Sequence, residues 1–155
     1  MRGEYSLIDE PHPSRLSHLT VRPTVPLLAL MLGGAWLAWP WFALNSVAMG
    51  SPTRRRELAL VVMGFGVSVV LAGLLVWALQ SGRIPLPVAR YAVLGVVVWK
   101  LGIAYTLHIL QSRTFGVYEH FGGPVRNGTP LLVPAFVLRA WWIGSFDDFF
   151  YLVLG

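Results

Sequence analysis

The chain has 155 residues, of which 55% are hydrophobic and only 12% are charged. Ordinary soluble domains carry about 25% charged residues, so this composition argues against a soluble globular domain and predicts an all-α integral membrane protein. The absence of cysteine excludes disulfide bonds, thiolate metal sites and cysteine nucleophiles. The net charge of +5 rests almost wholly on arginine, a bias typical of a GC-rich bacterial genome, and we expect a multi-pass protein of the bacterial inner membrane.

The first 22 residues form a polar tail that contains Glu4, Asp9 and Glu10. A secretory signal would place its apolar stretch near the start and a small-residue cleavage site after it. The first apolar stretch here is longer and comes later, so we expect it to remain as a membrane helix. The sequence thus divides into a polar tail (1–22) and a transmembrane domain (23–155).

Long stretches with few charges follow the tail. About 20 apolar residues cross a bilayer as a helix. On this criterion the sequence predicts four transmembrane helices, at about 25–49, 58–80, 89–111 and 131–153. The last of these carries three charges, and the longest connection precedes it.

The first predicted helix contains Pro40 and three tryptophans, Trp36, Trp39 and Trp41. Proline removes a backbone hydrogen bond, so a kink is expected there. Clustered tryptophans favour a position at the membrane interface. Because these rings lie well inside the predicted helix, packing against neighbouring helices is an equal alternative.

Small residues recur on the second and third predicted helices. Gly64, Ser68 and Ala72 are four residues apart, and Gly95 and Gly102 are seven apart. Such spacing lets two helices approach closely. The contact is either within the chain's own bundle, which we favour, or between copies in an oligomer.

Four spans do not fix the orientation of the chain, because five arginines then fall on each side of the membrane. The run Arg54, Arg55 and Arg56 indicates a cytoplasmic loop by the positive-inside rule. The long polar tail favours cytoplasmic termini, which is the orientation we slightly prefer.

Four charges, Lys100, Arg139, Asp147 and Asp148, fall inside predicted helices, where charges are costly and are functional candidates. Lys100 lies ten residues after Arg90, which is about 15 Å along a helix. Asp147 lies at a similar depth from the same face, because consecutive helices are antiparallel. We therefore expect Lys100 to pair with Asp147 or Asp148, while Arg139 extends toward the Leu131 end of its own helix.

Lys100, Ala104, His108 and Gln111 share one face of the third predicted helix. This polar face either turns into the bundle or toward the lipid head groups, or it lines a conduction pathway or a ligand site.

No pattern indicates catalysis. His108, Glu119 and His120 match no metal-binding spacing, and no phosphate loop, dinucleotide fingerprint or nucleophile elbow is present. We expect neither an enzyme, a metal nor a cofactor. The arginines flank apolar segments, which favours a lipid bilayer over nucleic acid as the partner.

Two segments carry a resemblance to a known type of protein. They contain Gly33-Gly34, Asn45, Gly50-Ser51-Pro52 and Arg54, and later Gln111, Tyr118, His120 and Gly122-Gly123. In this pattern the chain resembles small uncharacterised bacterial four-span membrane proteins, a resemblance that implies no activity. The leading hypothesis is a non-enzymatic subunit of a membrane assembly, built with other subunits or with copies of itself. The alternative is a small ion or proton channel or transporter, lined by Lys100, His108, Arg139, Asp147 and Asp148.

Overall fold

A computed structural model describes residues 14–142 and 148–155, and every regular element in these ranges is a helix. Two of the helices, α3 and α4, are long and apolar enough to cross a membrane. The predicted all-helical class is confirmed, with two candidate membrane-spanning helices. In chain order the elements are η1 (Ser17–Leu19), α1 (Thr24–Leu32), α2 (Ala35–Ala48), α3 (Arg54–Gln80), α4 (Leu86–His120), η2 (Thr129–Leu131), α5 (Leu132–Trp142) and α6 (Asp148–Leu154).

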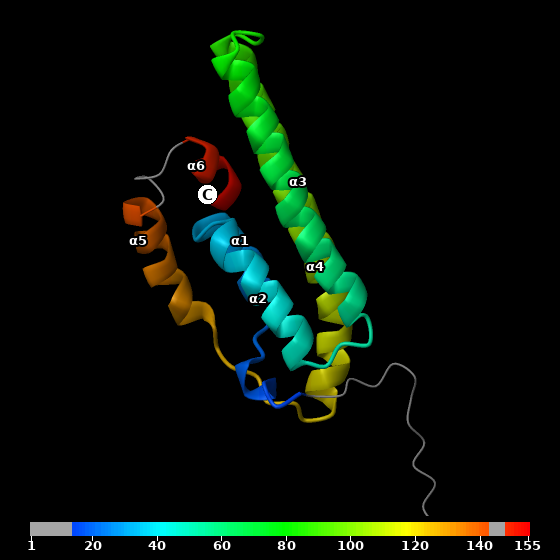
Figure 1. Cartoon of the computed structure of the whole chain (residues 1–155). Coiled ribbons are helices and arrows are strands. Elements are labelled where there is room, and N and C mark those ends of the chain that lie inside the picture. The colour runs from blue at the N-terminus through cyan, green and yellow to red at the C-terminus, as the bar shows by residue number, and fades with distance from the viewer. Residues whose placement is uncertain (1–13, 143–147) are drawn as a thin grey trace, which may run out of the picture.

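Helices α3 and α4 lie side by side as one long hairpin (Figure 1). The turn between them holds Gly82 at φ +66°, a left-handed conformation that glycine adopts without steric cost. Helix α3 covers the predicted 58–80. Helix α4 covers the predicted 89–111 and continues to His120.

The prediction of one helix over 25–49 is wrong, because the chain reverses direction at Gly33 and Gly34. Gly34 has φ +99°, which interrupts the helix there. The backbone N–H of Val21 donates to Asn45 Oδ1 at 3.0 Å, so the start of α1 lies beside the last turn of α2. Helices α1 and α2 therefore form a short hairpin whose two ends lie at the Arg54 end of α3 (Figure 1).

The prediction of one helix over 131–153 is also wrong in the described part of the chain. Helix α5 runs beside α1, since Leu132 shares a core cluster with Val25, and Arg139 lies next to Met31. Helix α6 runs back from the tip of α5 and ends beside Gly34 (Figure 1). The link 143–147 lies outside the described residues.

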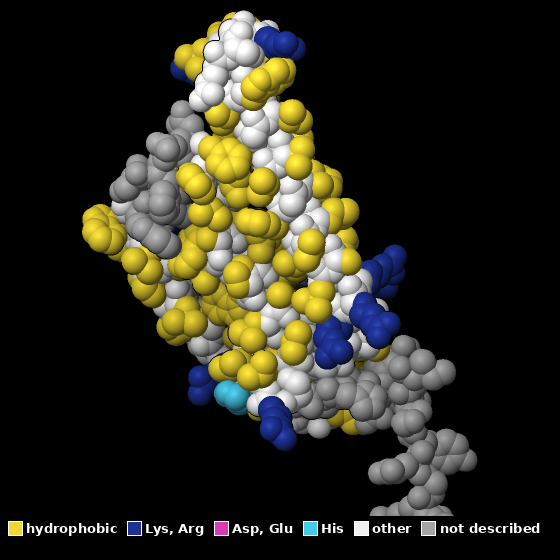
Figure 2. All heavy atoms as spheres, in the orientation of Figure 1, with side chains coloured by type: hydrophobic (Ala, Val, Ile, Leu, Met, Phe, Trp, Pro, Cys, Tyr) yellow, Lys and Arg dark blue, Asp and Glu magenta, His cyan; other side chains and the backbone are white. Residues whose placement is uncertain are grey.

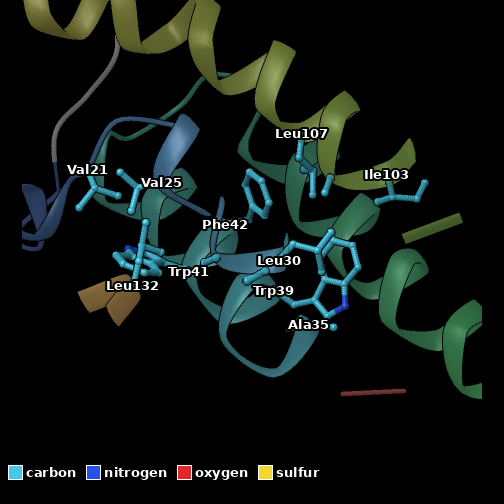
Figure 3. Packing of buried hydrophobic residues seen from close by; sticks show 13 residues of the cluster. Val21, Val25, Leu30, Ala35, Trp39, Trp41, Phe42, Ile103, Leu107 and Leu132 are labelled. Atoms are coloured by element: carbon cyan, nitrogen blue, oxygen red, sulfur yellow. The ribbon is translucent and has the colours of Figure 1, made fainter. Parts of the chain in front are cut away.

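The core lies where the α1–α2 hairpin packs against α4 and α5 (Figure 3). Trp39 and Trp41 are 3% and 8% exposed and belong to this core, so these two rings pack between helices. Helix α2 continues through Pro40, which lies on its exposed side. The α1–α2 hairpin and the helix pair α5 and α6 reach only part of the way along α3 and α4. The far ends of α3 and α4 extend beyond them (Figure 1).

Candidate functional site

A buried carboxylate, Glu57, lies at the base of the α1–α2 hairpin. It occupies the first turn of α3 and its exposed fraction is 0%. Its Oε1 accepts hydrogen bonds from Ser51 Oγ at 2.5 Å and Thr53 Oγ1 at 2.6 Å. Its Oε2 accepts one from Gln111 Nε2 at 3.1 Å. Three donors from the α2–α3 loop and from α4 thus converge on one carboxylate.

Gln111 connects this carboxylate to α2. Its Nε2 also donates to the Phe42 carbonyl oxygen at 2.8 Å, and its Oε1 accepts from Asn45 Nδ2 at 3.1 Å. Because Asn45 Oδ1 accepts the Val21 N–H, the chain of hydrogen bonds runs from the start of α1 to α3. We call this set the Glu57 network; it comprises Asn45, Ser51, Thr53, Glu57, Gln111 and Thr114.

Within the described part of the chain, Glu57 is stabilised by hydrogen bonds and not by a salt bridge. The ion pair found there joins Arg22 and Glu119, whose nitrogen and oxygen atoms are 3.8 Å apart. The neighbouring Arg54, Arg55 and Arg56 are exposed. Hydrogen-bond donors and the N-terminal end of a helix both favour a negative charge. A fully satisfied buried polar network also fixes one packing arrangement, since each broken bond leaves an unpaired group. The Glu57 network therefore holds α2, α3 and α4 together through buried hydrogen bonds.

Glu57 was not among the candidate residues predicted from the sequence, because it directly follows three arginines at the end of a predicted connection. A signal was present nonetheless. Glu57 lies seven residues before Gly64, on the helix face that also carries Ser68 and Ala72. All four are buried. Extending the small-residue face by two turns would have placed Glu57 inside the bundle.

Lys100 and Arg139, two of the four charges that lie within predicted membrane helices, are in the wall of one cavity. Lys100 is 5% exposed, and its Nζ lies 3.5 Å from the carbonyl oxygen of Val153 in the last turn of α6. Arg139 Nη1 donates to the carbonyl oxygens of Met31 at 3.0 Å and Leu32 at 3.5 Å. Arg139 therefore reaches across to the end of α1, and does not extend along α5 toward Leu131 as expected.

Lys100 and Arg139 both contact backbone carbonyl groups at the end of a helix. The last carbonyl groups of a helix lack partners within it and carry partial negative charge. Met31 and Leu32 end α1, and Val153 lies near the end of α6. Each cation thus lies at the C-terminal end of one short helix, where an apolar environment would leave those carbonyl groups unpaired.

The remaining predicted site residues are dispersed. Asp147 and the side chain of Asp148 lie outside the described residues, so the expected pair with Lys100 stays a prediction. His108 is half-buried on the inward face of α4, and it does not line the cavity of Lys100 and Arg139. A Cβ on Gly64 would lie 3.0 Å from Trp39 and from Ile103, so this glycine packs within the chain. Gly95 and Gly102 have no such neighbours and lie on an open face.

Comparison of the chain with protein-family models, with curated proteins and with solved structures gave no match.

Proposed function

We propose that the chain is an integral membrane protein in which α3 and α4 cross the bilayer. Arg113 lies 23 residues after Arg90 on α4, which corresponds to about 35 Å of helix, close to the thickness of a bilayer core. Large apolar side chains on this stretch are exposed, among them Tyr91 at 75% and Val98 at 67%. Basic side chains gather toward the two ends of the molecule with an apolar band between them (Figure 2). Lipid is the environment that suits this distribution.

In this arrangement α1–α2 enters the bilayer from one face and returns to it. Helix α5 enters from the same face, and α6 runs back only as far as Gly34, at the tip of the α1–α2 hairpin. The chain then makes two crossings, one re-entrant hairpin and one helix pair that returns part of the way, in place of the four crossings expected from the sequence. The contacts of Lys100 and Arg139 support this proposal, because helix ends inside a bilayer need partners for their carbonyl groups.

The re-entrant α1–α2 hairpin also affects the predicted orientation of the chain in the membrane. With α1–α2 re-entrant, seven described arginines lie at one face and two, Arg83 and Arg90, lie at the other. The positive-inside rule then places the arginine-rich face in the cytoplasm. The seven are Arg15, Arg22, Arg54, Arg55, Arg56, Arg113 and Arg126.

The function that this geometry supports best is that of a non-enzymatic subunit of a membrane assembly made of copies of the chain. The observation that carries it is the open face of α4 at Gly95 and Gly102, where an added Cβ would meet no neighbouring atom. Large apolar side chains close to these glycines are exposed, among them Leu94, Val98 and Leu101. Small residues on an apolar helix face let a second helix approach closely within a bilayer. A second copy of the chain, packed through this face of α4, would cover it.

The test is the mass of the protein in mild detergent and in lipid nanodiscs. We expect two or more copies in each particle. The variant G102L, at a position where an added Cβ would meet no neighbouring atom, should lower the mass to one copy while the helical circular dichroism is unchanged. The matched control is G66L, which is equally open but lies on α3. A single copy of the unmodified chain in nanodiscs would contradict the proposal.

The alternative function, an ion or proton channel or transporter, is favoured by one observation. Interrupted helices that meet near a charged residue are typical of transport sites, and α1 and α6 end beside Arg139 and Lys100. Ion flux into liposomes that is abolished by K100M would support this alternative, and flux equal to that of empty liposomes would exclude it.

A further inference from the structure

The cavity that Lys100 and Arg139 share is bounded by α1, α4, α5 and α6 and has a volume of about 380 Å³. This volume lies within the usual range of ligand pockets, roughly 300 to 1,000 Å³. Its wall is otherwise mostly apolar, with Leu30, Val93 and Leu152 among its residues, and Tyr151 and Gly155 complete the lining at the end of α6. The two cations therefore face a space whose other surfaces favour an aliphatic group.

Neither cation has a carboxylate partner in the part of the chain that the structure describes. Arg139 uses one of its nitrogen atoms, Nη1, for the carbonyl groups that end α1. The single contact of Lys100 is long, at 3.5 Å. Guanidinium and ammonium groups carry five and three N–H donors, so most of their donors have no partner here. Lys100 is buried, at 5% exposed, whereas Arg139 is partly exposed. A buried charge such as that of Lys100 is stable only when it is paired.

We propose that this cavity binds an amphiphilic anion, with an acidic head group against Lys100 and Arg139 and an aliphatic tail along the apolar wall. A neutral lipid would leave both cations unpaired. A small hydrophilic anion would leave the apolar wall in contact with water. This inference rests on the proposed membrane location only for the supply of ligand, because binding itself can be measured in detergent. A carboxylate of a fatty acid and the phosphate of a phospholipid share the required chemistry.

The experiment is a binding measurement on the purified full-length chain in a non-ionic detergent, with laurate as the probe and dodecanol as its uncharged counterpart. Laurate should bind at least tenfold more tightly than dodecanol. K100M and R139Q should each weaken laurate binding about tenfold or more, whereas R83Q, outside the cavity, should not. R139K keeps a charge and a donor, so it should retain part of the affinity if R139Q fails to fold. Native mass spectrometry with phosphatidylglycerol then distinguishes the two sources of the head group.

Equal binding of laurate and dodecanol, or of laurate to wild type and K100M, would overturn the proposal. Laurate binding that emerges only in a D147N/D148N variant would also overturn it, since the chain's own carboxylates would then occupy the cations. Because none of these outcomes depends on how many copies associate, failure here is distinguishable from failure of the proposed assembly.

Discussion

Replacing Glu57 with alanine removes the acceptor on which three hydrogen bonds converge. The Gln111 amide would keep its bond to the Phe42 carbonyl but would lose the partner for its second hydrogen. A buried donor without a partner costs about 1 to 3 kcal/mol. The hydroxyls of Ser51 and Thr53 lie 3.0 Å apart and can bond to each other, which reduces their cost to about 1 kcal/mol each. We therefore expect E57A to lower the free energy of unfolding by about 3 to 5 kcal/mol.

The assay is equilibrium unfolding in mild detergent, followed by circular dichroism or tryptophan fluorescence. E57Q keeps the side-chain volume and one carbonyl oxygen, so it should cost about 1 to 2 kcal/mol. E119Q is the matched control, because Glu119 is a half-exposed partner of Arg22 in a long ion pair. It should cost under about 0.5 kcal/mol.

The double variant E57A/Q111A gives a further check. Gln111 is the partner that E57A leaves unpaired. The double variant should therefore lose about 1 kcal/mol or more less free energy of unfolding than the sum of the losses of E57A and Q111A. If E57A unfolds at the same midpoint as E119Q, the buried hydrogen bonds to Glu57 do not stabilise the fold.

Two further predictions concern the hairpin tips. G34A forces a side chain into φ +99° with its Cβ 2.5 Å from the Leu154 carbonyl oxygen, so it should destabilise the fold by about 1 to 3 kcal/mol in thermal unfolding. G66A, where a Cβ meets no neighbouring atom, should be neutral or stabilising by up to about 1 kcal/mol. Equal changes in stability for G34A and G66A would contradict the tight turn at Gly34. R139Q should cost about 1.5 to 3 kcal/mol, because a charged donor to Met31 and Leu32 is lost, and R139K should recover part of this. Equal stabilities of R139Q and wild type would show that the helix end needs no such partner.

Charge spacing predicted the long helices because both follow from local composition. Mostly apolar stretches of more than 20 residues between arginines define α3 and the apolar part of α4, whatever these helices pack against. The same criterion failed at Gly33 and Gly34, since apolar residues flank this turn on both sides and no charge marks it. Apolar character reports contact with lipid or protein, and it does not distinguish a crossing from a return.

The candidate site was harder to predict, because its residues are distant in sequence. Gln111 was recognised on the inward polar face of α4, but its partners depend on how α2 and α3 pack against it. Lys100 and Arg139 were singled out as charges within apolar segments. Their contacts with backbone carbonyl groups could not be foreseen, because those groups exist as unpaired acceptors only once the helices are known to end there.

The most direct test of the central claim is the sidedness of the two ends of the α1–α2 hairpin. The chain has no cysteine, so the single-cysteine variants R15C, P52C and S81C can each be probed in intact cells with a membrane-impermeant maleimide. Arg15, Pro52 and Ser81 are all exposed. We predict that R15C and P52C react only after the membrane is permeabilised, and that S81C reacts in intact cells. Labelling of R15C and P52C from opposite sides would show that residues 25–49 cross the membrane, and would contradict the re-entrant hairpin.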